Sequence, residues 1–233
     1  MSTLTPPKSI SKRQELRQDK VVTVYAKVWE FFDANRLLVY GILGVLTLVL
    51  AGIIGYALLQ TQRADKAQEL LGTIVGVYEK GEYREALDGN ETTFGLLTIA
   101  EDYSSTQAGN LAQFYAADAL FRLGEYDQAL ELFEAFDKED NLVGASAYAG
   151  EAAIHELKEN YEQAGDLYRR AAIQFENELT SPDYLLAAGR AYEAAGAFAQ
   201  ARNAYVMIEE QYPESTQAAN VEFLLSRLEA RSQ

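Results

Sequence analysis

The chain of 233 residues contains no cysteine, one histidine and one tryptophan. Without cysteine it can form no disulfide, no thiolate nucleophile and no cysteine-ligated metal site. The single histidine, His155, has no second histidine or cysteine with which to complete a metal centre, so we expect it to pack within a helix and not to bind a ligand. No glycine-rich phosphate loop and no nucleophile motif occurs, and the charged run 137–140 is interpreted as a solvated loop. These absences predict a non-enzymatic protein with no cofactor, metal ion or small-molecule substrate.

Charge is also absent from the 23 residues between Leu37 and Leu59. A helix of that length is about 34 Å long, enough to cross a hydrocarbon layer of about 30 Å. A cleaved signal peptide would have a shorter apolar core, a short basic lead and a small-residue cleavage site. Here 36 residues precede the run and no such site follows before Gln60. We therefore expect residues 37–59 to form an uncleaved transmembrane helix.

Positive charge is concentrated before that run. Residues 1–36 carry seven basic and four acidic residues, a net charge of +3, whereas the remainder carries 13 basic and 31 acidic residues, a net charge of −18. Basic residues beside a span tend to stay in the cytoplasm, which predicts a cytoplasmic N-terminus and an exported C-terminal domain, although Arg63 and Lys66 weaken the bias. An acidic domain repels phosphates, so nucleic acid is not an expected partner. About 170 residues are enough to fold by apolar burial alone.

The segment before the span divides into two parts. Residues 1–18 are polar, contain Pro6 and Pro7, and are expected to be a disordered cytoplasmic tail. Residues 19–36 are expected to form an amphipathic juxtamembrane helix that either lies in the lipid interface or docks on another membrane subunit. Its apolar residues recur at steps of three and four, with Trp29 and Phe31 beside them: Val21, Val24, Tyr25, Val28 and Phe32.

Small residues lie close to one face of the predicted span. This face could allow another membrane helix to approach closely, although glycine is common in membrane helices generally. No proline or turn cluster follows until Glu79-Lys80-Gly81, so the span is expected to continue into the first helix of the next domain. The residues of the small-residue face are Gly41, Gly44, Ala51 and Gly55.

A short motif recurs four times after the span. Gly81-Glu82-Tyr83-Arg84-Glu85-Ala86 is similar to Gly124-Glu125-Tyr126-Asp127-Gln128-Ala129, and the pattern returns at 160–164 and 196–201. The alanines lie 43, 35 and 37 residues apart. A glycine that ends one helix, an aromatic in the corner and an alanine at a close crossing, repeated about every 34 residues, resemble the tetratricopeptide repeat.

The resemblance predicts an all-α solenoid over residues 60–233. No repeat has the family's tryptophan, Glu159 replaces the turn glycine of the third, and nine extra residues follow the first. A capping helix at 215–231 is expected to bury Val221, Phe223, Leu224, Leu225 and Leu228. The four expected repeats are residues 67–100, 110–143, 145–178 and 182–215.

Arrays of this kind hold peptides on a concave face formed by the first helix of each repeat. The expected groove mixes aromatic, apolar and oppositely charged side chains, some of which could instead pack against neighbouring helices. Counted by repeat position, its residues are Phe114, Asp118, Phe121, Arg122, Ala149, Ala153, Glu156, Leu186, Arg190 and Glu193.

The order of parts resembles the ancillary subunit of the bacterial Sec translocon, most closely its counterpart in Bacteroidetes-like bacteria. The resemblance depends on three segments: Asp33-Ala34-Asn35-Arg36, Glu85-Ala86-Leu87-Asp88-Gly89, and residues 101–112. It implies a single-pass inner-membrane protein whose periplasmic domain contacts translocon subunits and periplasmic chaperones. The alternative is a structural subunit of another envelope complex, attached through its tail and span.

Overall fold

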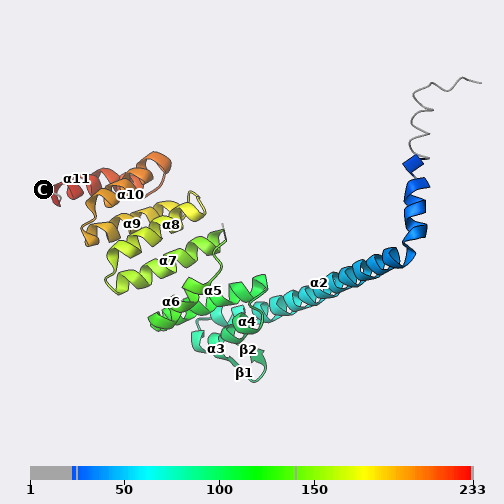
Figure 1. The fold of residues 1–233 in the computed structure, drawn as a ribbon. Helices are drawn as coiled ribbons and strands as arrows, with labels where there is room; N and C mark the ends of the chain where they lie inside the picture. Colours follow the sequence, from blue (N-terminus) through cyan, green and yellow to red (C-terminus); the bar gives the residue numbers. More distant parts are fainter. Residues whose placement is uncertain (1–22, 25, 140, 232–233) are drawn as a thin grey trace, which may run out of the picture. The chain divides into compact units, whose positions relative to one another are not determined.

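The computed structural model describes residues 23–24, 26–139 and 141–231. The chain divides into two compact units, Met1–Leu59 and Gln60–Gln233. The regular secondary structure of the described residues is helical apart from one short hairpin, which confirms the all-α prediction (Figure 1). The expected disordered tail at 1–18 lies outside the described residues, as do Val21 and Tyr25.

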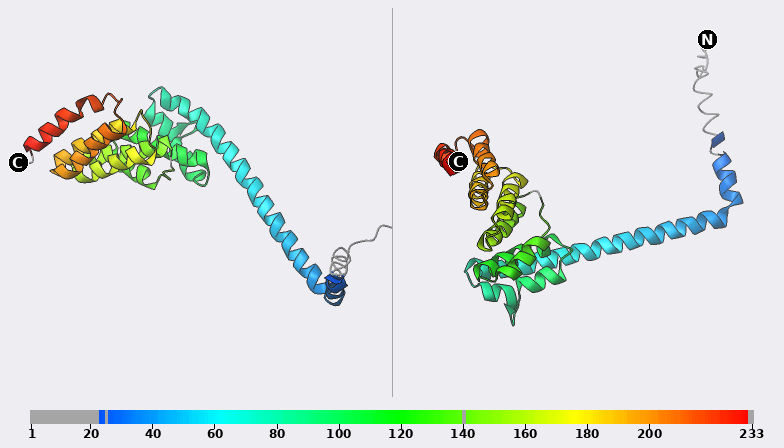
Figure 2. Two further views of the ribbon diagram at one scale, coloured as in Figure 1. Left: turned by 90° about the horizontal axis from the view of Figure 1, so that it is seen from above. Right: turned by 60° about the vertical axis from the view of Figure 1, so that its left-hand side comes forward.

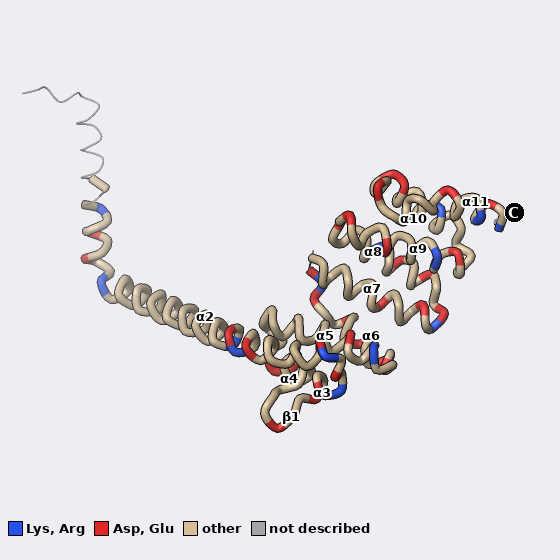
Figure 3. Tube along the Cα trace, turned by 180° about the vertical axis from the view of Figure 1, so that it is seen from behind, with Lys and Arg blue, Asp and Glu red and all other residues tan. Residues whose placement is uncertain are grey.

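The first unit contains a helical stretch, a turn and the start of helix α2. Residues 26–34 are helical, Asn35 forms a turn, and α2 spans Arg36–Glu79. Within the described residues α2 is the one helix long and apolar enough to cross a membrane, and none of its apolar window is buried. That stretch carries no charged residue (Figure 3). The bounds of α2 include both the predicted span and the predicted first repeat helix.

The second unit consists of helix pairs, in which each pair packs on the next (Figures 1 and 2). After α2 the chain turns into the short helix α3, which packs on α4 and α5, and a 3₁₀ turn, η1, leads into the last helix, α11. The bounds are α3 Tyr83–Asp88, α5 Gln107–Arg122, α6 Tyr126–Ala135, α7 Leu142–Leu157, α8 Tyr161–Gln174, α9 Ser181–Ala195, α10 Phe198–Gln211, η1 Ala218–Asn220 and α11 Val221–Arg231.

The insertion after the first repeat motif forms structure that the sequence analysis did not anticipate. Strands β1 (Gly89–Asn90) and β2 (Thr93–Phe94) pair antiparallel, and helix α4 (Leu96–Asp102) follows. The Asn90 side chain accepts a hydrogen bond from the Thr92 backbone N–H at 2.9 Å, a local bond that favours a turn over a continued helix. The second helix of the first repeat is therefore divided into α3 and α4.

The turns inside the repeats have the left-handed backbone that the motif predicts. Gly81, Gly124 and Gly196 have φ values of 81°, 79° and 74°. Glu159, which replaces the glycine in the third repeat, adopts the same conformation with a φ of 61°. A side chain at this φ is unfavourable, so the geometry of the turn persists against the local preference of the residue.

Close helix crossings explain the small residues of the motif. Ala86, Ala129, Ala164 and Ala201 are all completely buried. Gly189 in α9 faces the Tyr205 ring of α10 so closely that a Cβ atom there would lie 2.2 Å from a ring carbon. Small residues fit these positions because the neighbouring helix leaves no room for a larger side chain, at Gly189 because the Tyr205 ring occupies the space.

Most of the buried apolar side chains of the second unit fall into two clusters. One contains residues between Ala67 and Ile154, and the other contains residues between Ala172 and Leu228. The capping helix α11 contributes Val221, Leu224 and Leu228 to the second cluster, as predicted. The expectation for Phe223 is wrong, since it is 67% exposed. On a helix that buries positions 221, 224 and 228, residue 223 lies on the far side.

Candidate protein-binding surface

The predicted groove residues differ in how far solvent reaches them. Arg122, Glu156 and Arg190 are exposed, whereas Glu193 is buried. The remaining members of the predicted groove are half-buried: Phe114, Asp118, Phe121, Ala149, Ala153 and Leu186.

The two aromatic groove residues of α5 also serve the packing of the repeat. The Phe114 ring lies 6.0 Å from the ring of Phe133 and 5.7 Å from that of Phe136, centroid to centroid. The Phe121 ring lies 5.5 Å from that of Tyr126. Both residues therefore offer only part of their surface to a partner.

Asp118 and Arg122 form one charge network with the end of α2. The Arg122 guanidinium donates to the Asp118 carboxylate at 2.5 Å, and the Tyr78 hydroxyl donates to the same carboxylate. The pKa of Tyr78 is raised, first by burial and then by this hydrogen bond. Arg122 also lies over the Tyr83 ring, 5.6 Å from its centroid. The pair offers little net charge to a partner because its two members neutralise each other.

The third repeat contributes a carboxylate that is held in place. The Tyr168 hydroxyl of α8 donates to Glu156 of α7 at 3.0 Å, and burial, followed by this carboxylate, raises the pKa of Tyr168. Glu156 remains exposed, as does Arg190 on α9. This part of the surface therefore offers both charge signs to a partner.

Glu193 is buried and does not line the groove in which it was expected. Its carboxylate accepts hydrogen bonds from the Tyr205 hydroxyl at 2.6 Å, from Arg227 at 2.7 Å and from Arg231 at 3.0 Å. Burial opposes its ionisation, but the hydrogen bonds from Tyr205 and Arg227 and the charges of both arginines outweigh it, so the pKa of Glu193 is lowered. With the side chain only 4% exposed, it ties α9 to α10 and α11 and is not available to a ligand.

Lys138 is a second buried charge, and interpreting all of 137–140 as a solvated loop was wrong at this residue. Its ammonium lies 2.6 Å from Glu151 of α7, with both side chains less than 10% exposed. It also donates to backbone carbonyls at the end of α6, including that of Phe133. The Lys138 ammonium lies 5.2 Å from the centroid of the Tyr148 ring, and the Arg170 guanidinium lies 4.5 Å from the same centroid. Lys138 therefore links the second repeat to the third.

His155 lies one helical turn beyond Glu151 and is 7% exposed, which agrees with the packed position that was expected. Neither ring nitrogen has a hydrogen-bond partner among the described residues. The described residues also contain no group of three or more His, Asp or Glu side chains arranged to hold a metal ion.

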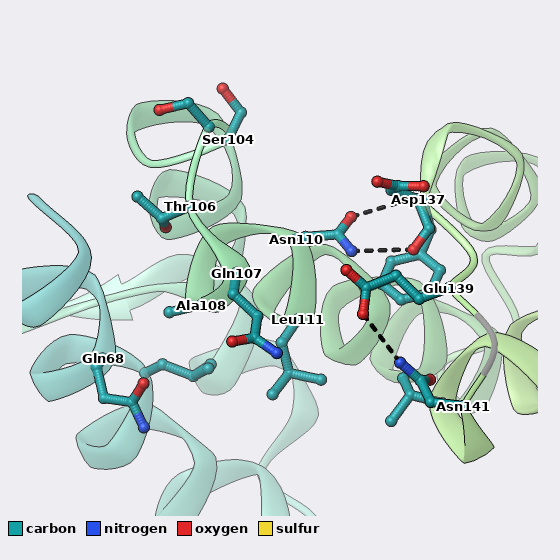
Figure 4. A pocket seen from close by; sticks show the side chains of 14 residues that line it. Gln68, Ser104, Thr106, Gln107, Ala108, Asn110, Leu111, Asp137, Glu139 and Asn141 are labelled. Carbon is teal, nitrogen blue, oxygen red and sulfur yellow. Dashed lines mark hydrogen bonds between the residues drawn. The ribbon is translucent and has the colours of Figure 1, made fainter. Parts of the chain in front are cut away.

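A cavity of about 660 Å³ opens at one edge of the repeats (Figure 4). The end of α2, the start of α5 and the loop after α6 line it, with Leu71, Leu111 and Phe136 as apolar walls. Asn110 braces the loop by donating to the Asp137 carbonyl and accepting from the Asp137 backbone N–H, both at 3.0 Å. No basic side chain is among the described residues that line it. This cavity was not predicted from the sequence. A helix-capping residue such as Thr106, whose Oγ1 accepts from the Gly109 N–H at 3.0 Å, indicates where a helix begins but not the space between helices.

Comparison with known protein families gives a match to two segments of the second unit. The tetratricopeptide repeat family model matches residues 111–140 and 183–215. These two segments are similar to tetratricopeptide repeats. The matched segments include most of α5 and α6 and nearly all of α9 and α10, which correspond to the second and fourth predicted repeats. Tetratricopeptide repeats indicate a protein–protein interaction scaffold, and no catalytic family matches the chain. A search of curated proteins found no match.

The small-residue face of α2 is open in the first unit. Gly41, Gly44 and Ala51 are exposed and Gly55 is half-buried. A Cβ atom added to Gly41, Gly44 or Gly55 would meet nothing within 4 Å. The face is thus accessible to a neighbouring helix, which is the property that the predicted membrane-helix interface requires.

Proposed function

We propose that this protein is a single-pass scaffold of the bacterial inner membrane that presents tetratricopeptide repeats to the periplasm and assists protein export. The observation that carries the proposal is the presence, in one chain, of an exposed 23-residue apolar run and an array of tetratricopeptide repeats. Residues 37–59 would anchor the protein with its N-terminus in the cytoplasm. The repeats would bind translocon subunits and periplasmic chaperones.

The composition of the repeat surface supports a partner that is bound through shape and a few contacts. Glu156 and Arg190 expose opposite charges, and Phe121 and Leu186 are apolar residues that solvent reaches in part. Most of the energy of such an interface comes from a few anchor residues, so we expect modest affinity. The acidic surface of the second unit further disfavours nucleic acid as a partner (Figure 3).

A second candidate function is a structural subunit of another envelope complex. The open glycine face of α2 favours this reading, because it offers a helix-packing surface that needs no peptide in the groove. The two functions differ in which membrane protein is recovered with this chain.

The test is a crosslink-stabilised purification of the full-length protein from membranes of the native cells, beside a variant whose residues 1–59 are replaced by an unrelated anchor. Recovery of translocon subunits or chaperones with the native protein supports the export function. If the anchor variant loses the translocon subunits, residues 1–59 make that contact. Recovery of another envelope assembly instead would favour the structural function.

A second variant examines the glycine face alone. Replacing Gly41, Gly44 and Gly55 by leucine should weaken recovery of the membrane subunit severalfold while leaving the repeat domain folded, because leucine keeps the helices apart. The matched control replaces Leu43, Leu46 and Leu58 by isoleucine, which keeps the glycines. Equal recovery from both variants would remove this face from the interface.

A further inference from the structure

The short helical stretch before the predicted span has an apolar face that no other described residue covers. Val24 and Val28 are both 62% exposed and Phe31 is 59% exposed. Because these residues are spaced by four and three positions, they lie on one side of a helix. We call Val24, Val28 and Phe31 the juxtamembrane face.

The other sides of the same helix are polar. By helical period, Glu30 and Asp33 lie on the side opposite the juxtamembrane face, whereas Lys27 lies at its border. Phe32 lies at the other border. Trp29, which is 56% exposed, lies beyond Phe32 toward the polar side, its ring 6.0 Å from the ring of Phe32. A helix with an apolar side, a basic residue at its border and a tryptophan has the composition of helices that lie in a membrane interface.

The helix ends where such a helix would have to meet a span. Asn35 interrupts the helical conformation, and its side-chain amide donates to the Phe31 carbonyl at 3.0 Å. The rings of Phe32 and Tyr40 are 5.7 Å apart, although eight residues on a straight helix are separated by about 12 Å along the axis. The chain therefore bends at Asn35, and the apolar run begins two residues later (Figure 1).

We propose that the helix around residues 26–34 lies in the headgroup region of a lipid bilayer, with the juxtamembrane face toward the acyl chains and Trp29 at headgroup level. The proposal rests on the proposed membrane anchoring. Lipid is the occupant because the helix adjoins the start of the apolar run, so the bilayer surface is the first surface within reach of Val28 and Phe31. Lys27, which has no acidic partner among the described residues, would face anionic lipid phosphates.

The chain carries its own reporter, since Trp29 is its only tryptophan. The full-length protein would be reconstituted in nanodiscs of phosphatidylcholine with phosphatidylglycerol. Tryptophan emission would be quenched from the water by iodide and from the bilayer by lipids brominated at known depths. Two reference proteins carry Trp29→Phe together with Leu50→Trp, in the middle of the run, or Leu179→Trp, which replaces a side chain that is 84% exposed in the repeat domain.

The expected result places Trp29 between the two references. Iodide should quench it at least about threefold less than the tryptophan of the Leu179→Trp protein, and shallow brominated lipids should quench it more than deep ones. In a protein that carries Val28→Glu, which puts a charge on the juxtamembrane face, iodide quenching of Trp29 should rise toward the Leu179→Trp value. Lys27→Glu should increase iodide access more in anionic than in neutral nanodiscs.

Two contrary outcomes are distinguishable. If iodide quenches Trp29 as strongly as the Leu179→Trp reference while deep lipids quench the Leu50→Trp reference, the anchoring stands and the interfacial helix is wrong, which leaves docking on another subunit. If lipids fail to quench the Leu50→Trp reference as well, the anchoring itself is wrong and the interfacial helix falls with it.

Discussion

At the scale of single residues, the repeat domain is governed by a few positions where backbone geometry or burial leaves little freedom. Glu159 occupies a left-handed turn that three glycines occupy elsewhere, and Lys138 and Glu151 form an ion pair away from water. These positions are the ones where a single substitution is expected to change stability in a stated direction.

Replacing Glu159 by glycine should stabilise the domain. Glycine removes the left-handed penalty of about 1–2 kcal/mol and adds unfolded-state entropy worth about 0.5–1 kcal/mol, so the net gain should be about 0.5–1 kcal/mol. Chemical denaturation followed by circular dichroism would measure it. Gly124→Ala is the matched control and should destabilise, since φ is 79° there. A Glu159→Gly protein no more stable than the parent would show that the Glu159 side chain compensates its own strain.

Replacing Lys138 by methionine should destabilise the domain by about 3–5 kcal/mol, because Glu151 would be left buried without its counter-charge. The double variant Lys138→Met, Glu151→Leu should recover most of that loss, since it removes both charges together. Denaturation midpoints of the two variants and the parent test this coupling. Losses that simply add in the double variant would mean that the two charges do not interact.

At the scale of elements, each repeat has a buried alanine near the start of its second helix, and α11 packs on the last helix pair. Ala129 is completely buried between α5 and α6, where no space remains for a larger side chain. The last pair is different, because α11 is fastened both by apolar residues and by the two arginines that reach Glu193.

Replacing Ala129 by tryptophan should destabilise the domain by about 1–3 kcal/mol through overpacking of the crossing. The thermal transition followed by circular dichroism is the measurement, with Gln128→Trp, at an exposed neighbouring position, as the control. An unchanged transition in the Ala129→Trp protein would mean that the alanine does not mark the crossing of the second repeat.

The contacts of α11 should weaken in acid. The pKa of Glu193 is lowered on folding, so its contribution to stability is present above its ordinary pKa of 4.5 and is lost as the pH falls below 4.5 through the folded-state value. Hydrogen exchange measured between pH 6 and pH 3 should show α11 losing protection relative to α9. Glu193→Gln should cost about 1–2 kcal/mol at pH 7 and flatten this pH dependence. An α11 equally protected at both pH values would contradict the role of Glu193.

The repeated turns and helix pairs could be predicted from the sequence. The positions of Glu193 and Lys138 could not, because they are set by contacts with residues far away in the sequence. The turn glycines and crossing alanines followed from local motifs, whereas the left-handed backbone of Glu159, a departure from the motif, is a finding of the structure. Glu193 was assigned to the groove because its repeat position faces inward in an array that continues, whereas here Arg227 and Arg231, 34 and 38 residues later, cover it. The hairpin and α4 could not be predicted from a repeat period, since an insertion has no period. Lys138 looked solvated because its partner, Glu151, lies on the next helix.

At the scale of the whole molecule, the two units draw on different parts of the sequence. All members of both core clusters lie between Ala67 and Leu228, so the first unit contributes none of them. The charges also differ between the units, since the first has seven basic and four acidic residues and the second has 13 basic and 31 acidic residues.

A protein reduced to residues 60–233 should therefore fold without detergent. It should keep a thermal midpoint within a few degrees of that of the full chain in detergent, because removing residues 1–59 exposes no core side chain. Its net charge of −18 should keep it soluble. Circular dichroism melts and size-exclusion chromatography would test both points. Aggregation of the fragment, or a much lower midpoint, would show that the second unit depends on the first.

The division of the core into two clusters also sets an order of events during synthesis. The first cluster uses no residue beyond Ile154, so it can close before the helices that follow have emerged from the ribosome. The second cluster cannot close until Leu228 has been synthesised. A nascent chain would thus already display the folded surface of its first two repeats while its last repeats remain open to a chaperone.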